Sequence, residues 1–103
     1  MSFSITPLHV KPYSFGMAPG DVEPLRFIPE QAVSGPPVAK LYNHETGEAA
    51  SPDPSVVPFE DIYIVTVTAP ETPLEAIYTL EIESTGTNGR IWTDRITILV
   101  PGV

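Results

Sequence analysis

Apolar and polar residues alternate through most of the C-terminal half of the chain. Segments 61–68, 76–84 and 90–100 place apolar side chains at alternate positions, as Leu80 and Ile82 do. Successive side chains of a strand point to opposite faces, so this alternation predicts half-buried β-strands. On these strands we expect the aromatic residues to belong to the core rather than to a binding platform, namely Tyr63, Tyr78 and Trp92.

Two local signals refine this half of the chain. Residues 85–89 end in Asn88-Gly89, a pair typical of a tight hairpin turn. Asp94 interrupts the inward-facing series of the last strand, which predicts a β-bulge at that position.

The N-terminal half shows a weaker pattern. A first strand over residues 3–10 is expected to kink at Pro7 and to lie at a sheet edge. Further strands are predicted over 21–28, with Val22, Leu25 and Phe27 as apolar anchors, and over 38–42 before a turn at 43–47.

The connections are rich in proline. Residues 12–20 are predicted as a loop and the Pro-rich stretch 49–58 as irregular, although these stretches could hide one or two more strands. Thirteen prolines argue against long helices, and no segment shows a convincing 3.6-residue period. The prediction is one all-β domain over residues 1–103, an antiparallel β-sandwich of about seven strands, with residues 1–12 as an extended arm.

Several segments resemble an immunoglobulin-like (Ig-like) domain. Residues 75–82 and 92–100 resemble its last hairpin, and Pro19-Gly20-Asp21 before a strand and residues 38–47 also fit the pattern. The chain has no cysteine and Trp92 lies on the last predicted strand, so the resemblance is to Ig-like domains broadly and not to antibodies.

An acidic, cysteine-free Ig-like chain resembles the small virion proteins of tailed bacteriophages. No basic segment followed by an apolar stretch opens the sequence, so we expect no secretion signal, and Met1 with the ending at 101–103 indicates a complete reading frame. The resemblance implies a non-enzymatic capsid decoration (cement) protein, made in the host cytoplasm and located in the virion. Its partner would be the lattice of the major capsid protein or another virion subunit. The alternatives are a tail or baseplate subunit and a carbohydrate- or cell-surface-binding module.

The charge of the chain narrows the classes of partner. The formal net charge is −8, which argues against nucleic acid and anionic membranes. Nine acids and no Lys or Arg lie within residues 41–89, a window that is either a face for a basic partner or simply a solvated surface.

Candidate catalytic and metal-binding groups are few. The only histidines are His9 and His44. A histidine that acts as a catalytic base needs a nucleophile, and the sequence has no Gly-x-Ser-x-Gly nucleophile motif, so no enzyme is predicted. Glu81 and Glu83 are two residues apart on one strand, which is typical of a wet face. No cofactor and no metal site are predicted.

Contact with a partner is therefore assigned to the N-terminal arm and to the Pro-rich segments. Extended proline segments lose little entropy when they dock, and a homo-oligomer would add avidity. The residues predicted to make the contact are Phe3, Ile5, Leu8, Pro36, Pro37, Pro54, Val57 and Phe59.

Overall fold

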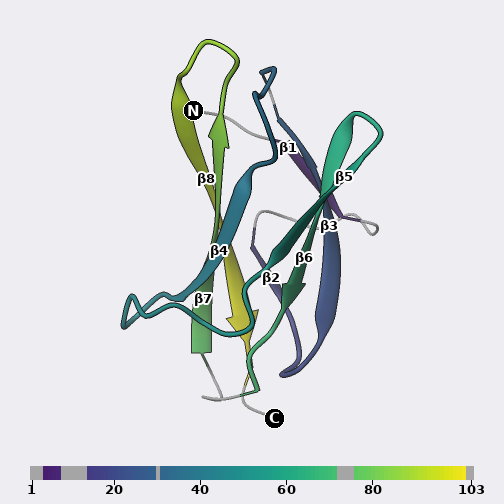
Figure 1. Cartoon of the computed structure of the whole chain (residues 1–103). Helices are drawn as coiled ribbons and strands as arrows, with labels where there is room; N and C mark the ends of the chain where they lie inside the picture. Colours follow the sequence, from purple (N-terminus) through teal and green to yellow (C-terminus); the bar gives the residue numbers. More distant parts are fainter. Residues whose placement is uncertain (1–3, 8–13, 30, 72–75, 102–103) are drawn as a thin grey trace.

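The computed structural model describes residues 4–7, 14–29, 31–71 and 76–101 (Figure 1). None of these residues belongs to a helix, and in them no helix is long and apolar enough to cross a membrane. They form eight strands: β1 (Ser4–Pro7), β2 (Ser14–Gly16), β3 (Val22–Ile28), β4 (Val38–Asn43), β5 (Ser55–Phe59), β6 (Ile62–Thr68), β7 (Ala76–Thr85) and β8 (Ile91–Val100).

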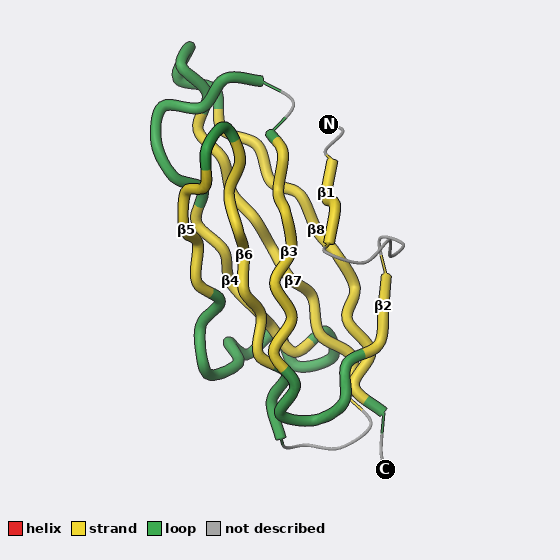
Figure 2. Tube along the Cα trace, turned by 90° about the vertical axis from the view of Figure 1, so that its right-hand side faces the viewer, coloured by secondary structure: helices red, strands yellow, loops and turns green. Residues whose placement is uncertain are grey.

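The strands form two four-stranded sheets that face each other (Figure 2). One sheet has the order β1-β3-β6-β5 and the other the order β2-β8-β7-β4. Six longer strands, three in each sheet, carry the sandwich, and the short β1 and β2 each add one edge. All the pairings are antiparallel except that of β2 with β8, which is parallel.

This strand order is that of an immunoglobulin domain. With β2 set aside, one sheet joins the first, second, fifth and fourth strands, and the other joins the seventh, sixth and third. These are the two sheets of the constant-type Ig sandwich. The predicted all-β, Ig-like sandwich is therefore confirmed, and the strand count differs only slightly from the predicted seven.

The core lies between the sheets and consists of the inward residues of β3, β4, β6, β7 and β8. Leu25, Phe27, Val65, Leu80 and Ile82 have no exposed surface. Each large side chain buried in this way stabilises the fold by about 1.5–3 kcal/mol. Tyr78 and Trp92 are also buried and Tyr63 packs against the core, so the predicted core role of these aromatic residues is confirmed.

The hairpin of β7 and β8 contradicts the predicted bulge. Its register runs without interruption from Ala76 opposite Val100 to Thr85 opposite Ile91. Asp94 lies in register opposite Ile82 and is only 3% exposed, so its carboxylate occupies an inward position that an apolar residue usually holds. Polarity alone made a bulge the simpler interpretation, since carboxylates are rarely buried.

Two strands lie in stretches that were predicted to be a loop and irregular. β2 occupies residues 14–16 and pairs with β8, and β5 occupies residues 55–59 and pairs with β6. They are the one or two further strands that these stretches were expected to hide. The prediction of Val22 as a core anchor was wrong, because Val22 is 57% exposed. Val22 and the buried Leu25 are three positions apart, and an odd spacing places two residues of a strand on opposite faces.

The predicted turns are confirmed. In the turn after β4, the Oδ1 of Asn43 accepts hydrogen bonds from the backbone N–H groups of Glu45 (2.9 Å) and Thr46 (3.1 Å). Gly47 follows with a φ of 75°, a conformation that glycine adopts without strain. The hairpin loop after β7 is closed by a bond from the N–H of Gly86 to the carbonyl of Arg90.

Candidate docking surface

The outer face of the β1-β3-β6-β5 sheet carries apolar side chains where solvent-facing polar residues would be usual. In the register of the sheet, Val57 of β5 lies beside Ile64 of β6, and Ile64 lies beside Arg26 of β3. Phe59 is the Cα partner of Ile62 in the next row. We call this surface the Phe59 face, and it consists of Pro24, Arg26, Val57, Phe59, Ile62 and Ile64.

The apolar groups of this face remain accessible. The exposed fractions are 55% for Val57 and 56% for Phe59. A hollow of about 490 Å³ is lined by Pro24, Arg26, Phe59 and Ile64. A large aromatic group beside a shallow apolar hollow is the arrangement that buried anchors of protein interfaces use.

The tight turn between β5 and β6 fixes the position of Phe59. Only Glu60 and Asp61 separate Phe59 from its Cα partner Ile62. Glu60 has a φ of 55°, a left-handed conformation that costs a non-glycine residue about 1–2 kcal/mol. The short connection holds Phe59 on paired backbone, so little entropy is lost when a partner contacts its ring.

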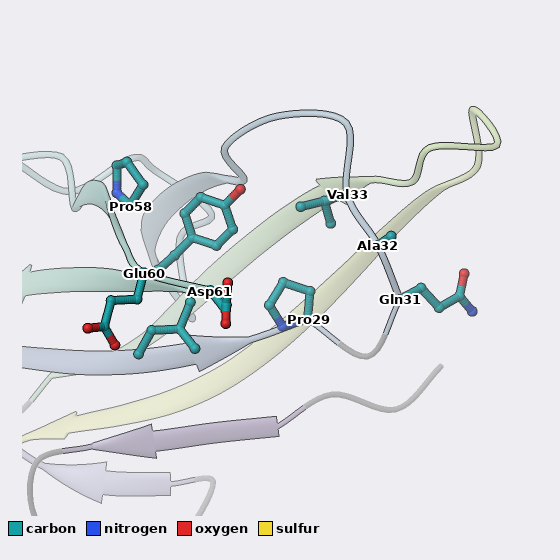
Figure 3. Close-up of a pocket in the computed structure, with 9 residues that line it drawn as sticks. Pro29, Gln31, Ala32, Val33, Pro58, Glu60 and Asp61 are labelled. Carbon is teal, nitrogen blue, oxygen red and sulfur yellow. The ribbon is translucent and has the colours of Figure 1, made fainter.

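A second hollow, of about 350 Å³, lies beside the same turn (Figure 3). Figure 3 shows Pro58, Glu60 and Asp61 on one side of it, and Pro29, Gln31, Ala32 and Val33 on the other. The hydroxyl of Tyr63, which also lines it, donates a hydrogen bond to the carbonyl of Gly35 (3.4 Å). Its described lining residues include the carboxylates of Glu60 and Asp61 but no histidine, serine or lysine.

The predicted contact residues differ in whether the structure leaves them exposed. Val57 and Phe59 lie together on the Phe59 face, and Pro36 is exposed in the segment before β4. Pro37 and Pro54 are buried, which argues against their use as freely exposed contacts.

The N-terminal part of the prediction is largely outside the described residues. Phe3 and Leu8 lie there, as does most of the arm 1–12. Ile5 lies in β1, where its Cα partner is Phe27 of β3.

Sequence reasoning missed Pro24, Arg26, Ile62 and Ile64 as members of this surface. The available signal was parity: in β3 the residues at even numbers alternate with the buried Leu25 and Phe27, and so face outward. By the same alternation, the side chains of Ile62 and Ile64 point to the opposite face of β6 from the buried Val65 and Val67. Parity does not say which strands become neighbours, and that pairing gathers the surface.

The other candidate groups that the structure describes lie apart from this surface. Within the described residues, no group of three or more His, Cys, Asp and Glu side chains is placed to hold a metal ion. The Nδ1 of His44 lies 3.1 Å from the Oγ1 of Thr79 on an exposed surface. Burial raises the pKa of Tyr78 above its ordinary value, and this side chain is only 2% exposed.

Solved structures similar to this chain include two that contain titin domains. No protein-family model and no curated protein matches the sequence. The crystal structure of the titin M3 domain is similar at 17% identity and a TM-score of 0.48, over 97% of this chain and 95% of that one. The crystal structure of the complex of titin M10 with the Ig domain of obscurin-like 1 contains a chain at 17% identity and a TM-score of 0.40, over 99% of this chain and 96% of that one.

Proposed function

We propose that this chain is a non-enzymatic structural protein that docks onto another protein through the Phe59 face. One observation carries the proposal: two half-exposed apolar residues of β5, Val57 and Phe59, lie on the same face of the sheet. In its finer form, the partner is the assembled capsid lattice of a tailed bacteriophage and the chain is a decoration protein located in the virion.

The composition of the face favours a protein partner. Pro24 and Ile64 line the hollow together with Phe59, and Arg26 is the one charged residue among its described lining residues. Aromatic and Arg side chains are enriched at the centres of protein interfaces. A sugar-binding aromatic group would instead need several polar neighbours that form hydrogen bonds with the hydroxyl groups of the ligand.

Docking of this kind stabilises a lattice by mass action. A protein that binds the assembled state and not the dissociated subunits lowers the free energy of the assembled state. The effect grows with the number of sites occupied, so even modest affinity at each site raises the stability of the whole shell. A protein that bridges neighbouring subunits needs a rigid body with fixed contact points, which the paired strands β3, β5 and β6 supply.

The test is co-sedimentation with capsids prepared from the same source without this protein. We expect saturable binding at a fixed stoichiometry and a raised capsid melting temperature. Phe59→Ala should weaken binding by about tenfold or more, because it removes the central aromatic anchor. Ile91→Ala is the matched control, since Ile91 is 60% exposed but lies on β8 of the other sheet.

Two results would overturn the proposal. If the wild-type chain does not sediment with capsids, it is not a decoration protein. If Phe59→Ala and Ile91→Ala bind capsids equally well, the Phe59 face is not the contact. Binding to a glycan array that is lost in Phe59→Ala would instead assign the face to carbohydrate recognition.

A further inference from the structure

The β4 strand leaves one side of its sheet open. It is the last strand in the order β2-β8-β7-β4, so only β7 pairs with it along its length. Other edge strands are short or contain proline, as β1 does at Pro7 and β5 at Pro58. Proline and shortness protect edges from pairing with other chains. β4 has six residues and no proline, and it lacks both protections.

Hydrogen bonds at one end of β4 show which backbone groups face outward. The carbonyl of Leu41 accepts a bond from the N–H of Ala50, and the N–H of Asn43 donates to the carbonyl of Glu48 (both 2.8 Å). The N–H and C=O of one residue in a strand point to the same side, and the side alternates along the strand. The outward groups are therefore those of Ala39, Leu41 and Asn43.

Three of these groups have no partner among the described residues. The loop at 48–50 takes up the Leu41 carbonyl and the Asn43 N–H. The N–H and carbonyl of Ala39 and the N–H of Leu41 remain, and no hydrogen bond within the described part of the chain uses them. They form a short template for one more strand.

A groove runs along this same stretch of β4. Its volume is about 560 Å³. Residues of β4, Lys40 among them, line it together with Pro54, Val56 of β5 and the exposed Asp53. Pro37 lies where the groove begins, so two proline segments predicted to contact a partner border it. The inward-facing side chains of an added strand would enter this groove, whose apolar lining includes Leu41 and Val56.

We propose that β4 receives an extended segment of a partner protein, which adds one strand to the β2-β8-β7-β4 sheet. A residue of that segment bonds both backbone groups of Ala39 and points an apolar side chain into the groove. A Lys or Arg of the segment approaches Asp53. This site is separate from the Phe59 face and does not depend on the function proposed for that face.

Charge favours a foreign basic segment over a second copy of this chain. Asp53 and Lys40 line the groove, and two further acids, Glu81 and Glu83, lie on the neighbouring β7 across from Lys40 and Val38. Of these two, Glu81 is bridged to Arg95 at 3.2 Å. A second β4 would bring the same acids and another chain of net charge −8 toward this edge. Like charges at close range oppose such pairing, whereas a basic segment is attracted.

The test uses synthetic octapeptides of alternating valine and threonine. One peptide carries a central lysine and its matched partner carries glutamate at the same position. Amide hydrogen exchange of the full chain is followed by NMR as each peptide is added. With the lysine peptide, we expect the amides of Ala39 and Leu41 to exchange at least about tenfold more slowly at saturation. Those of Lys40 and Tyr42, which face β7, should not change.

Variants identify the groups involved. Asp53→Lys should reverse the preference, so that the glutamate peptide binds more tightly than the lysine peptide. Ala39→Pro removes an outward N–H without removing a bond to β7, and it should abolish the protection of Leu41 by peptide. Phe59→Ala is the control that should leave peptide binding unchanged, which separates this test from that of the Phe59 face.

Three outcomes would overturn the proposal. One is that neither peptide slows exchange at Ala39 and Leu41. Another is that protection appears but is the same for both peptides in the wild type and in Asp53→Lys. The third is a concentration-dependent dimer of the wild type that Ala39→Pro makes monomeric, because the occupant would then be a second copy.

Discussion

At the scale of single residues, Glu60 is the one non-glycine residue with a positive φ among those that the structure describes. Its φ of 55° is one that glycine adopts freely and other residues adopt at a cost of about 1–2 kcal/mol. Glu60→Gly removes this strain, while the greater entropy of glycine in the unfolded chain offsets roughly 0.5–1 kcal/mol of the gain. We expect the free energy of unfolding in urea to rise by about 0.5–1 kcal/mol.

The adjacent Asp61 provides the control for Glu60. It occupies the same turn but is not among the described residues with a positive φ, so Asp61→Gly brings only the entropic cost. That variant should lower the free energy of unfolding by about 0.5–1 kcal/mol. Equal destabilisation by the two substitutions would contradict the assignment of strain to Glu60.

A second prediction at this scale concerns the ionisation of Tyr78. Burial raises the pKa of this hydroxyl, so above the ordinary tyrosine pKa of about 10 the unfolded chain releases a proton that the folded chain retains. The stability present below that pH is therefore lost as the pH rises, at no more than about 1.4 kcal/mol per pH unit for this group. Tyr78→Phe should reduce the alkaline loss in denaturant unfolding. Identical alkaline profiles for the wild type and Tyr78→Phe would refute this.

The pattern of apolar residues predicted the core correctly, but it did not predict that Asp94 is buried there. The period-two pattern identified Leu80, Ile82 and Trp92 as buried, because apolar area drives these side chains inward wherever the strand lies. Asp94 shares their inward parity, but nothing in the sequence shows that a continuous ten-pair register would keep it there. Its burial depends on the neighbouring strand, which local sequence does not encode.

At the scale of strands, local sequence does not encode which strands pair, and this is why only part of the candidate site could be predicted. Val57 and Phe59 could be named from the sequence because apolar residues in a Pro-rich stretch stand out. β5 itself could not, because Pro58 and the short length weaken its strand signal. Pro24 and Arg26 join the Phe59 face only because β6 pairs with both β3 and β5. Such non-local pairing is set by the packing of the whole sandwich.

Strand position also predicts how the chain opens locally. β7 pairs on both sides, with β8 and with β4, whereas β4 is bonded along its length to β7 alone. Amide exchange from β7 should therefore require near-global unfolding, while the outward amides of Ala39 and Leu41 on β4 need none. We expect the amides of Leu80 and Ile82 to exchange at least about 100-fold more slowly than those of Ala39 and Leu41. Comparable rates in the free protein would mean that the β4 edge is already covered.

At the scale of the whole molecule, the excess of acidic residues and the apolar Phe59 face should respond differently to ionic strength. The chain carries 13 acids and five bases, and its self-repulsion disfavours the compact state at low ionic strength. The Phe59 face adds apolar surface with a single cation, Arg26, next to its hollow. The acidic residues 41–89 were left with two interpretations, a face for a basic partner or a solvated surface, and the response of binding to salt distinguishes them.

Salt should stabilise the fold and leave capsid binding nearly unchanged. Raising NaCl from roughly 20 to roughly 300 mM shortens the screening length severalfold, so the repulsion among the acids weakens and the free energy of unfolding should rise by up to about 1 kcal/mol. If the Phe59 face makes the contact, its apolar burial is insensitive to screening, and the dissociation constant for capsids should change by less than about threefold. A contact through the acidic residues would instead weaken by about tenfold or more over the same range, because attraction between exposed charges is lost. Sedimentation titrations at the two salt concentrations measure the difference. A large loss of affinity in a chain that salt makes more stable would transfer the docking role from Phe59 to the acidic surface.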